Sequence, residues 1–128
     1  RRQRQMCIRD SAEKLQDLVT LYVMNERYVP KKWRFMIGQD LIKKIDELND
    51  NIIAANSIYA MSEQDLASRK AYAQKAIANG YQLQRKLSRL IRCVPSATAA
   101  SLEEITSLLS QETDDLKGWR KNDKIRAR

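Results

Sequence analysis

One stripe of apolar residues in the middle of the chain constrains the fold most. Its members follow one another at steps of four, three, four, three and four positions, a period close to 3.5 residues. Such a period keeps side chains on one face of a helix and is typical of helices that pack lengthwise at a shallow angle. The 128 residues include only three glycines and two prolines, so few positions interrupt a helix. The stripe predicts one helix from just after Pro30 to about Ala60. Its members are Leu41, Ile45, Leu48, Ile52, Ala55 and Tyr59.

The segment before Pro30 is predicted to form a helix that begins near Asp10 or Ser11. Asp10 and Glu13 have the spacing of a capping box, in which two side chains satisfy free backbone amides at a helix start. Because a proline disfavours helical geometry in the residue before it, this helix is expected to end at about residues 27–29.

Two more helices are predicted in the second half of the chain. Ser62, with Asp65 three positions on, is a typical cap for a helix that continues to the second proline. Ser101 with Glu104 forms a capping box for the last helix, although Thr98 is an alternative cap one turn earlier. Four helices joined by short turns predict an all-α protein, an up-down-up-down antiparallel four-helix bundle.

The length fits a single domain over residues 1–128. Residues 1–9 and 122–128 are expected to be a flexible basic arm and a flexible basic tail. No segment approaches the ~18 to 20 consecutive apolar residues that span a bilayer, and the arginine-rich start leads into no apolar stretch of a signal peptide. A cytoplasmic protein is expected.

The composition argues against most hydrolytic and metal chemistry. Histidine is absent, which removes the commonest general base and the usual zinc ligand. The two cysteines, Cys7 and Cys93, are far apart in the sequence, and two free thiols are favoured over one disulfide. We therefore expect no enzyme, no catalytic residue, no metal site and no cofactor.

Positive charge is concentrated in a few places. The formal net charge is +8, from 24 Lys and Arg against 16 Asp and Glu, which favours binding to a polyanion. Acidic residues gather in the last predicted helix, so the charge is polarised. The candidate nucleic-acid-binding residues are Lys31, Lys32, Arg34, Arg85, Lys86, Arg89, Arg92, Arg120, Lys121 and Lys124.

The predicted topology places these candidates at two poles. The start of the second helix and the end of the third share one end of an antiparallel bundle, whereas the C-terminal tail lies at the other. Arg85, Arg89 and Arg92 are spaced by four and three residues and so share one helix face. Arginine forks suit bidentate contacts to phosphate oxygens. The alternative for each of these arginines is an ordinary solvated helix face.

The two tryptophans have two interpretations each, packing in the core or stacking on a base. Trp119 lies at core spacing on the last predicted helix, so packing is favoured there. Trp33 lies beside two lysines, and neither interpretation is preferred.

These residues resemble a known family, the accessory variability proteins (Avd) of diversity-generating retroelements, which are similar to bundle proteins encoded in bacterial rRNA intervening sequences. The resemblance covers about residues 10–124 and includes the basic third helix and the turn at Pro95. Its motifs are Leu21-Tyr22, Val29-Pro30-Lys31-Lys32, Arg34-Phe35, Gly38-Gln39-Asp40-Leu41 and Leu116-Lys117-Gly118-Trp119-Arg120-Lys121.

The resemblance implies a basic homopentamer, bacterial or phage-encoded, that binds a reverse transcriptase and its template RNA, with DNA as a further ligand. In that family the bundle has no active site and supports mutagenic cDNA synthesis by the polymerase. The positions that match the family's nucleic-acid contacts are Arg85, Lys86, Arg89 and Arg92, and Lys31, Lys32 and Arg34 fit its basic turn.

Two alternatives differ from this hypothesis in the partner. The basic surface of an oligomeric bundle can instead dock an acidic protein without binding nucleic acid. Binding to a membrane surface is less favoured, because the basic groups lack an adjoining apolar face of the kind that interfacial helices carry.

Overall fold

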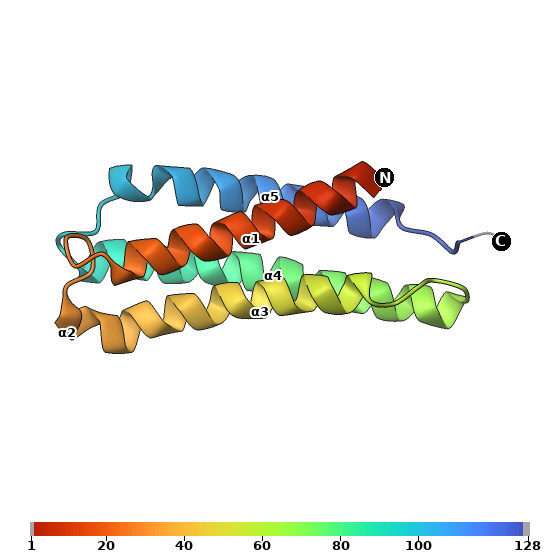
Figure 1. The fold of residues 1–128 in the computed structure, drawn as a ribbon, viewed down its shortest axis with the longest axis horizontal. Coiled ribbons are helices and arrows are strands. Elements are labelled where there is room, and N and C mark those ends of the chain that lie inside the picture. The colour runs from red at the N-terminus through yellow and green to blue at the C-terminus, as the bar shows by residue number, and fades with distance from the viewer. Residues whose placement is uncertain (1, 127–128) are drawn as a thin grey trace.

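Four long helices form a helical bundle (Figure 1). The structure is a computed structural model that describes residues 2–126, with side chains from residue 7 onward. No strand occurs in that part of the chain. The elements, in chain order, are α1 (Arg2–Met24), α2 (Lys31–Trp33), η1 (Arg34–Gly38), α3 (Gln39–Asn56), α4 (Glu63–Cys93), η2 (Ala100–Leu102) and α5 (Glu103–Asn122).

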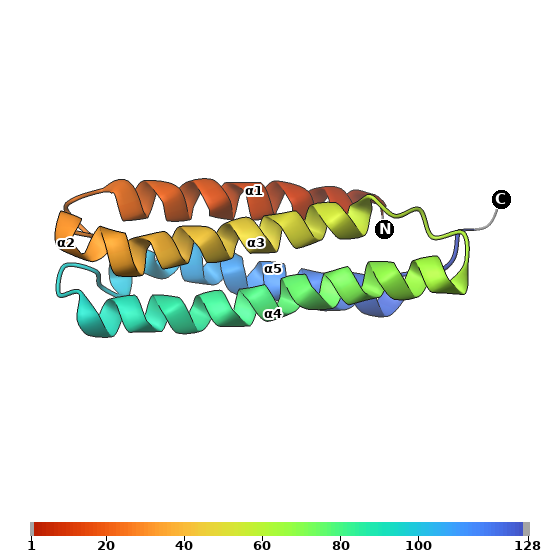
Figure 2. The ribbon, with the colours of Figure 1, turned by 90° about the horizontal axis from the view of Figure 1, so that it is seen from below.

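The connections between the helices gather at two ends. The chain passes from α1 through α2 into α3 at one end, where the loop from α4 to α5 also lies in both views (Figures 1 and 2). The loop from α3 to α4 lies at the opposite end, near the point where the C-terminal segment leaves α5. The beginning of α3 therefore shares an end with the last turns of α4, as predicted.

The predicted second helix is divided in the structure. A short turn, α2, follows Pro30, and η1 is a π-helical turn that leads into α3. Five of the six predicted stripe residues are buried, but Tyr59 is 63% exposed, and its prediction was wrong. The helix ends at Asn56 because the carbonyls of the following loop serve other donors. Ile58 accepts a bond from Arg69, and Ala60 accepts one from the Arg126 amide at 2.7 Å.

The first helix begins earlier than predicted, at Arg2 instead of near Asp10. The physical reason is the burial of side chains that precede the predicted cap. Ile8 is 2% exposed and continues the buried spacing of Ala12 and Leu15 by another turn, so burial extends the helix past the expected cap.

The remaining helix starts follow local capping chemistry. Ser62 accepts a hydrogen bond from the Asp65 amide at 3.1 Å, which confirms the predicted cap of α4. The predicted box of Ser101 with Glu104 was wrong. Thr98 and Ser101 instead exchange side-chain-to-backbone bonds of 3.1 and 3.2 Å at the start of η2, close to the alternative start at Thr98.

The core runs the length of the bundle between the four helices. Gly80 brings α4 and α5 close together, because a Cβ atom there would lie 2.8 Å from the Thr113 Oγ1. Trp119 is 4% exposed, which confirms its predicted place in the core. Trp33 is half-buried against the core and has the Lys32 Nζ 5.5 Å from its ring centre. Cys7 and Cys93 are free, as predicted, and both are exposed.

Candidate nucleic-acid interface

A groove of about 480 Å³ on the surface of α3 and α4 gathers all four predicted contacts in α4. Five cations and one amide line it, and no carboxylate is among its lining residues. The six are Lys44, Gln82, Arg85, Lys86, Arg89 and Arg92. We call this surface the basic groove.

The three arginines of the basic groove are exposed along one face of α4. Arg85 and Arg89 are about 6 Å apart along the helix axis, and Arg92 follows about 4.5 Å further on, from the rise per residue of an α-helix. Within residues 7–126, no ion pair of up to 4.0 Å involves any of the three. Their guanidinium groups are therefore available to an external anion.

Both lysines of the groove have carboxylate partners. The Lys86 Nζ lies 2.6 Å from an Asp40 oxygen, and the Lys44 Nζ lies 3.1 Å from a Glu47 oxygen. Lys44 belongs to α3 and Lys86 to α4, and a bound anion would have to compete with Glu47 and Asp40 for them.

Sequence reasoning missed Lys44. The sequence shows only that Lys44 lies one turn after Asp40 on a predicted helix. Which face of that helix packs toward α4 does not follow from the positions of the charges. The structure shows that Lys44 faces the same groove as the cations of α4.

Of the predicted residues near α2, none lines the basic groove. Lys31 and Lys32 are exposed in α2, which lies at the end of the bundle where α4 ends (Figure 2). Arg34 is half-buried and serves a different purpose from the predicted phosphate contact. Its guanidinium donates to the carbonyls of Val23, Met24 and Val29 at 3.2, 3.4 and 3.3 Å, and so caps the end of α1.

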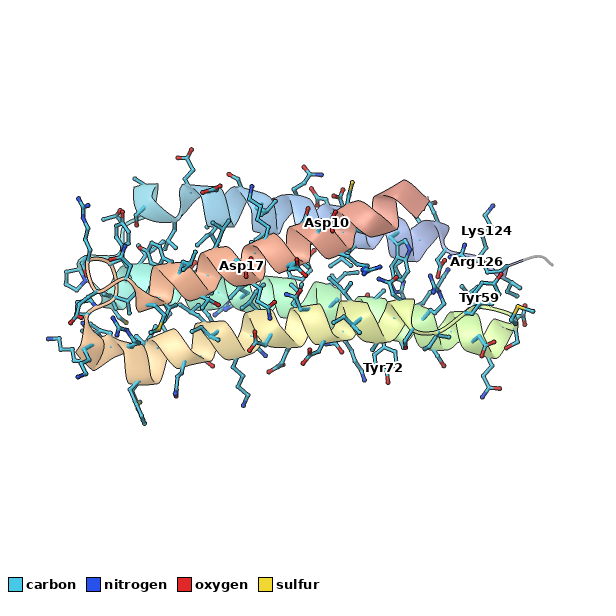
Figure 3. All side chains as sticks on the ribbon, in the orientation of Figure 1. Asp10, Asp17, Tyr59, Tyr72, Lys124 and Arg126 are labelled. Carbon is cyan, nitrogen blue, oxygen red and sulfur yellow. The ribbon has the colours of Figure 1, made fainter. Side chains whose placement is uncertain are left out.

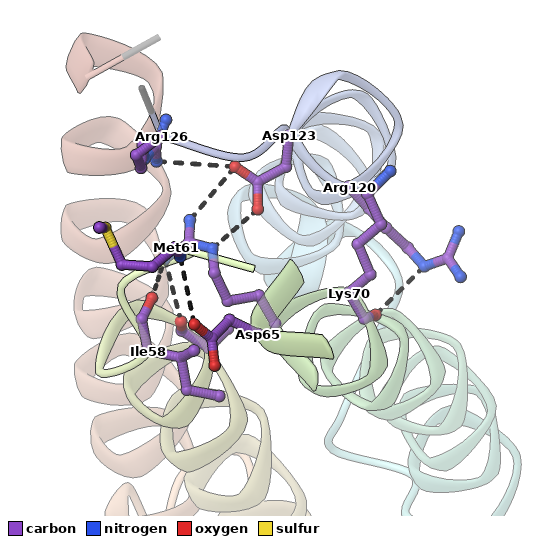
Figure 4. A network of polar contacts seen from close by, with 9 residues as sticks. Ile58, Met61, Asp65, Lys70, Arg120, Asp123 and Arg126 are labelled. Atoms are coloured by element: carbon purple, nitrogen blue, oxygen red, sulfur yellow. Dashed lines mark hydrogen bonds and ion pairs between the residues drawn. The ribbon is translucent and has the colours of Figure 1, made fainter. Parts of the chain in front are cut away.

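The predicted residues of the C-terminal tail lie at the opposite end from α2 (Figures 1 and 3). Arg120 is half-buried and donates from Nε to the Lys70 carbonyl at 3.2 Å (Figure 4). Lys121 and Lys124 are exposed. The basic candidates therefore form two separate poles, as expected, and the four on α4 line the basic groove.

The tail itself is held against the bundle as far as Arg126. Asp123 is buried and receives two bonds from the Arg69 guanidinium, at 2.8 and 3.3 Å (Figure 4). Arg69 also donates to the carbonyls of Ala55 and Ile58 and lies over the Trp119 ring, with its central carbon 5.0 Å from the ring centre. We call this contact the tail clasp. Residues 127 and 128 lie outside the described residues.

A second buried acid occupies the inner face of α5. Glu112 is fully buried, and neither carboxylate oxygen has a hydrogen-bond partner among the described residues. Burial, with a smaller contribution from the negative charge of Asp115, raises the pKa of Glu112 from 4.5 to about 8. The sequence marked this position only as a break in the apolar stripe of the last helix.

The described residues include no group of three or more His, Cys, Asp or Glu side chains placed to hold a metal ion. None of the described helices is both long and apolar enough to cross a membrane. Comparison of the chain with family models, with curated proteins and with solved structures gives no match.

Proposed function

We propose that this chain is a non-catalytic RNA-binding protein with an up-down-up-down antiparallel bundle, and that RNA phosphates bind in the basic groove. The observation that carries the proposal is the row of Arg85, Arg89 and Arg92, exposed on one face of α4 without an acidic partner in the described chain. Each guanidinium offers a planar fork of donors that matches two oxygens of one phosphate.

A row of arginines suits a chain of phosphates better than a single anion. The three groups spread over about 10 Å of helix, so they can contact successive backbone phosphates. Such contacts release condensed counterions and give an affinity that depends on backbone charge rather than on base sequence. The carboxylates of Asp40 and Glu47 at the border of the groove limit how far the phosphate path extends toward α3.

The family resemblance adds a partner to this proposal. A reverse transcriptase would use the bundle as a cytoplasmic accessory subunit during mutagenic cDNA synthesis, and five copies would assemble. The alternative is an oligomeric bundle whose basic groove docks an acidic protein and binds no nucleic acid. Both hypotheses use the same three arginines, so mutating these residues does not distinguish them. The identity of the bound ligand does.

The test is a salt series of binding to a structured RNA. The wild type should lose affinity steeply as salt rises. The triple variant Arg85→Glu, Arg89→Glu, Arg92→Glu should bind at least tenfold more weakly, and its log–log salt slope should be smaller by about 2 to 3, since each of the three lost phosphate contacts removes roughly 0.7 to 0.9.

The matched control is the triple variant Arg9→Glu, Lys75→Glu, Lys117→Glu, which changes three exposed cations outside the groove. It lowers the net charge equally, so an equal loss of RNA affinity would show a diffuse charge effect and contradict a defined site. No RNA binding by the wild type, together with saturable binding of a polyglutamate-rich protein, would favour the alternative. Light scattering of the free protein tests the five-copy assembly separately.

A further inference from the structure

The outer face of α3 and η1 carries a second groove of opposite character. It has a volume of about 560 Å³, and its lining combines large apolar side chains with four carboxylates and one lysine. The lining residues are Phe35, Met36, Gln39, Asp40, Ile42, Lys43, Asp46, Glu47 and Asp50. We call this surface the acidic groove.

Two of the most exposed apolar side chains of the described chain form one end of the acidic groove. Phe35 is 74% exposed and Met36 is 71% exposed. Both lie in the π-helical turn, whose next two residues, Ile37 and Gly38, are buried. The turn packs so closely on α1 that a Cβ at Gly38 would lie 2.7 Å from the Val23 Cγ1. The backbone thus presents Phe35 and Met36 outward from a fixed base.

Arg34 adds to that rigidity. Its guanidinium joins the turn to three carbonyls at and after the end of α1. A π-turn inside a helical segment is frequent at functional sites, and apolar anchors held in place before binding lose little conformational entropy on binding. The two exposed anchors are therefore well placed for a partner to bury.

The charge of the rest of the groove defines the partner. Asp40 and Glu47 are paired with Lys86 and Lys44 at the border of the groove. Asp46 and Asp50 remain against Lys43, so the strip beyond the border is negative on a protein whose formal charge is +8. Asp50 is exposed and has no ion-pair partner among residues 7–126. A strip with apolar anchors at one end and carboxylates over the rest complements a cationic amphipathic segment and repels phosphate.

The dimensions favour a helix as that segment. Phe35 and Asp50 are separated by about 22 Å along the helical path, the length of about 15 residues of α-helix. An amphipathic helix binds in such a groove through apolar residues three and four positions apart. We propose that the acidic groove docks a basic amphipathic helix of a partner protein, with its apolar turn on Phe35 and Met36 and its Lys or Arg side chains toward Asp46 and Asp50.

This site is independent of the proposed RNA site. The ion pairs of Lys86 with Asp40 and of Lys44 with Glu47 lie on the border and separate the two grooves. RNA would approach one side of that border and a cationic helix the other. A failure to bind RNA would leave the docking proposal standing, and a failure to dock a helix would leave the RNA proposal standing.

The test uses the full chain and a labelled synthetic peptide of about 16 residues, matched to the groove length. One face carries two leucines in a terminal turn and lysines at every third or fourth position beyond it. We expect saturable binding by fluorescence anisotropy. The same peptide with glutamate in place of lysine should bind at least tenfold more weakly.

Two pairs of variants locate the site. Phe35→Ser with Met36→Ser should weaken peptide binding at least tenfold, whereas Leu21→Ser with Tyr59→Ser, which alters two exposed apolar residues outside the groove, should leave it unchanged. Asp50→Lys should weaken it about two- to fivefold, and the matched Asp17→Lys on α1 should not (Figure 3). All of these substitutions are at exposed positions, so the fold should remain. The Phe35→Ser, Met36→Ser variant keeps the charge of the wild type, so its RNA affinity should be unchanged.

Three results would overturn the proposal. Equal binding of the lysine and glutamate peptides would remove the charge argument. A change from oligomer to monomer in the Phe35→Ser, Met36→Ser variant, measured by light scattering, would assign the groove to a second copy of the chain. Co-sedimentation with anionic vesicles that requires Phe35 and Met36, in a protein that does not bind the peptide, would assign it to a lipid surface.

Discussion

Two carboxylic acids are buried in the described part of this bundle, and they differ in whether a hydrogen-bond partner faces them. Asp123, just after α5, receives two hydrogen bonds from Arg69, whose guanidinium also contacts the Trp119 ring. Glu112, eleven positions earlier on the inner face of α5, has no hydrogen-bond partner for either oxygen in the described structure. The comparison teaches that burial alone does not determine the role of an acid; its partner does.

The difference has a direct electrostatic consequence. A buried carboxylate without a partner is so costly that the group keeps its proton instead, and burial raises the pKa of Glu112 to about 8. Near neutral pH the bundle therefore encloses a neutral acid at Glu112. At the tail clasp, the ion pair and hydrogen bonds between Arg69 and Asp123 offset the free-energy cost of burying both charges.

The largest expected effect is a loss of stability as pH rises. The unfolded chain loses the Glu112 proton above about 4.5, while the folded chain holds it up to about 8, so folding takes up a proton between these values. The free energy of unfolding should fall by roughly 3 kcal/mol from pH 5.5 to 8, at 1.36 kcal/mol for each pH unit. Urea unfolding at a series of pH values measures this.

The control for that experiment is Glu112→Gln, which is similar in size and does not titrate. Its stability should be nearly constant over the same range. The chain has no histidine, so few other side chains titrate between pH 5.5 and 8. If the free energy of unfolding of the wild type is as independent of pH as that of the variant, the pKa of Glu112 is not raised and the contrast with Asp123 does not hold.

A somewhat smaller effect is expected at the tail clasp. Asp123→Asn removes the charge that faces the buried Arg69 and should lower the free energy of unfolding by about 2 to 3 kcal/mol. This lies at or below the lower end of the usual range for breaking a buried pair, because two backbone carbonyls still accept bonds from the guanidinium. Thermal unfolding at pH 6 is a suitable measurement. Lys124→Asn, an exposed neighbour, should have little effect.

The smallest expected effect is the coupling between the two acids. Eleven helical residues separate them by about 16 Å, and distant sites without shared partners add within about 0.5 kcal/mol. Unfolding of the double variant Glu112→Gln, Asp123→Asn should therefore give the sum of the two single changes. A larger deviation would mean that the two acids belong to one electrostatic system and that their contrast is not local.

The sequence predicted burial and capping correctly where these depend on the spacing of residues along one helix. The period along α3 predicted five buried residues, and the Ser62 cap and the buried Trp119 followed from local pattern. It was misleading where tertiary contacts decide. Tyr59 continued the period, but the loop carbonyls beyond Asn56 bind Arg69 and Arg126, and the helix ends.

In the candidate site, too, helix geometry was predictable from the sequence and contacts between helices were not. The shared face of Arg85, Arg89 and Arg92 follows from helix geometry alone. The contribution of Lys44 depends on how α3 is rotated against α4, and the capping by Arg34 depends on where α1 ends. Charge in a sequence does not say which cation is already used inside the protein.

The tail clasp also has a consequence for the kinetics of folding. The contact between Arg69 and Asp123 joins residues 54 positions apart, and the Arg126 amide binds the Ala60 carbonyl across a longer stretch still. Closing so large a loop has an entropic cost, whereas helical turns form from neighbours. The clasp is therefore expected to close after the folding transition state, so that it governs how fast the bundle opens and has little influence on how fast it forms.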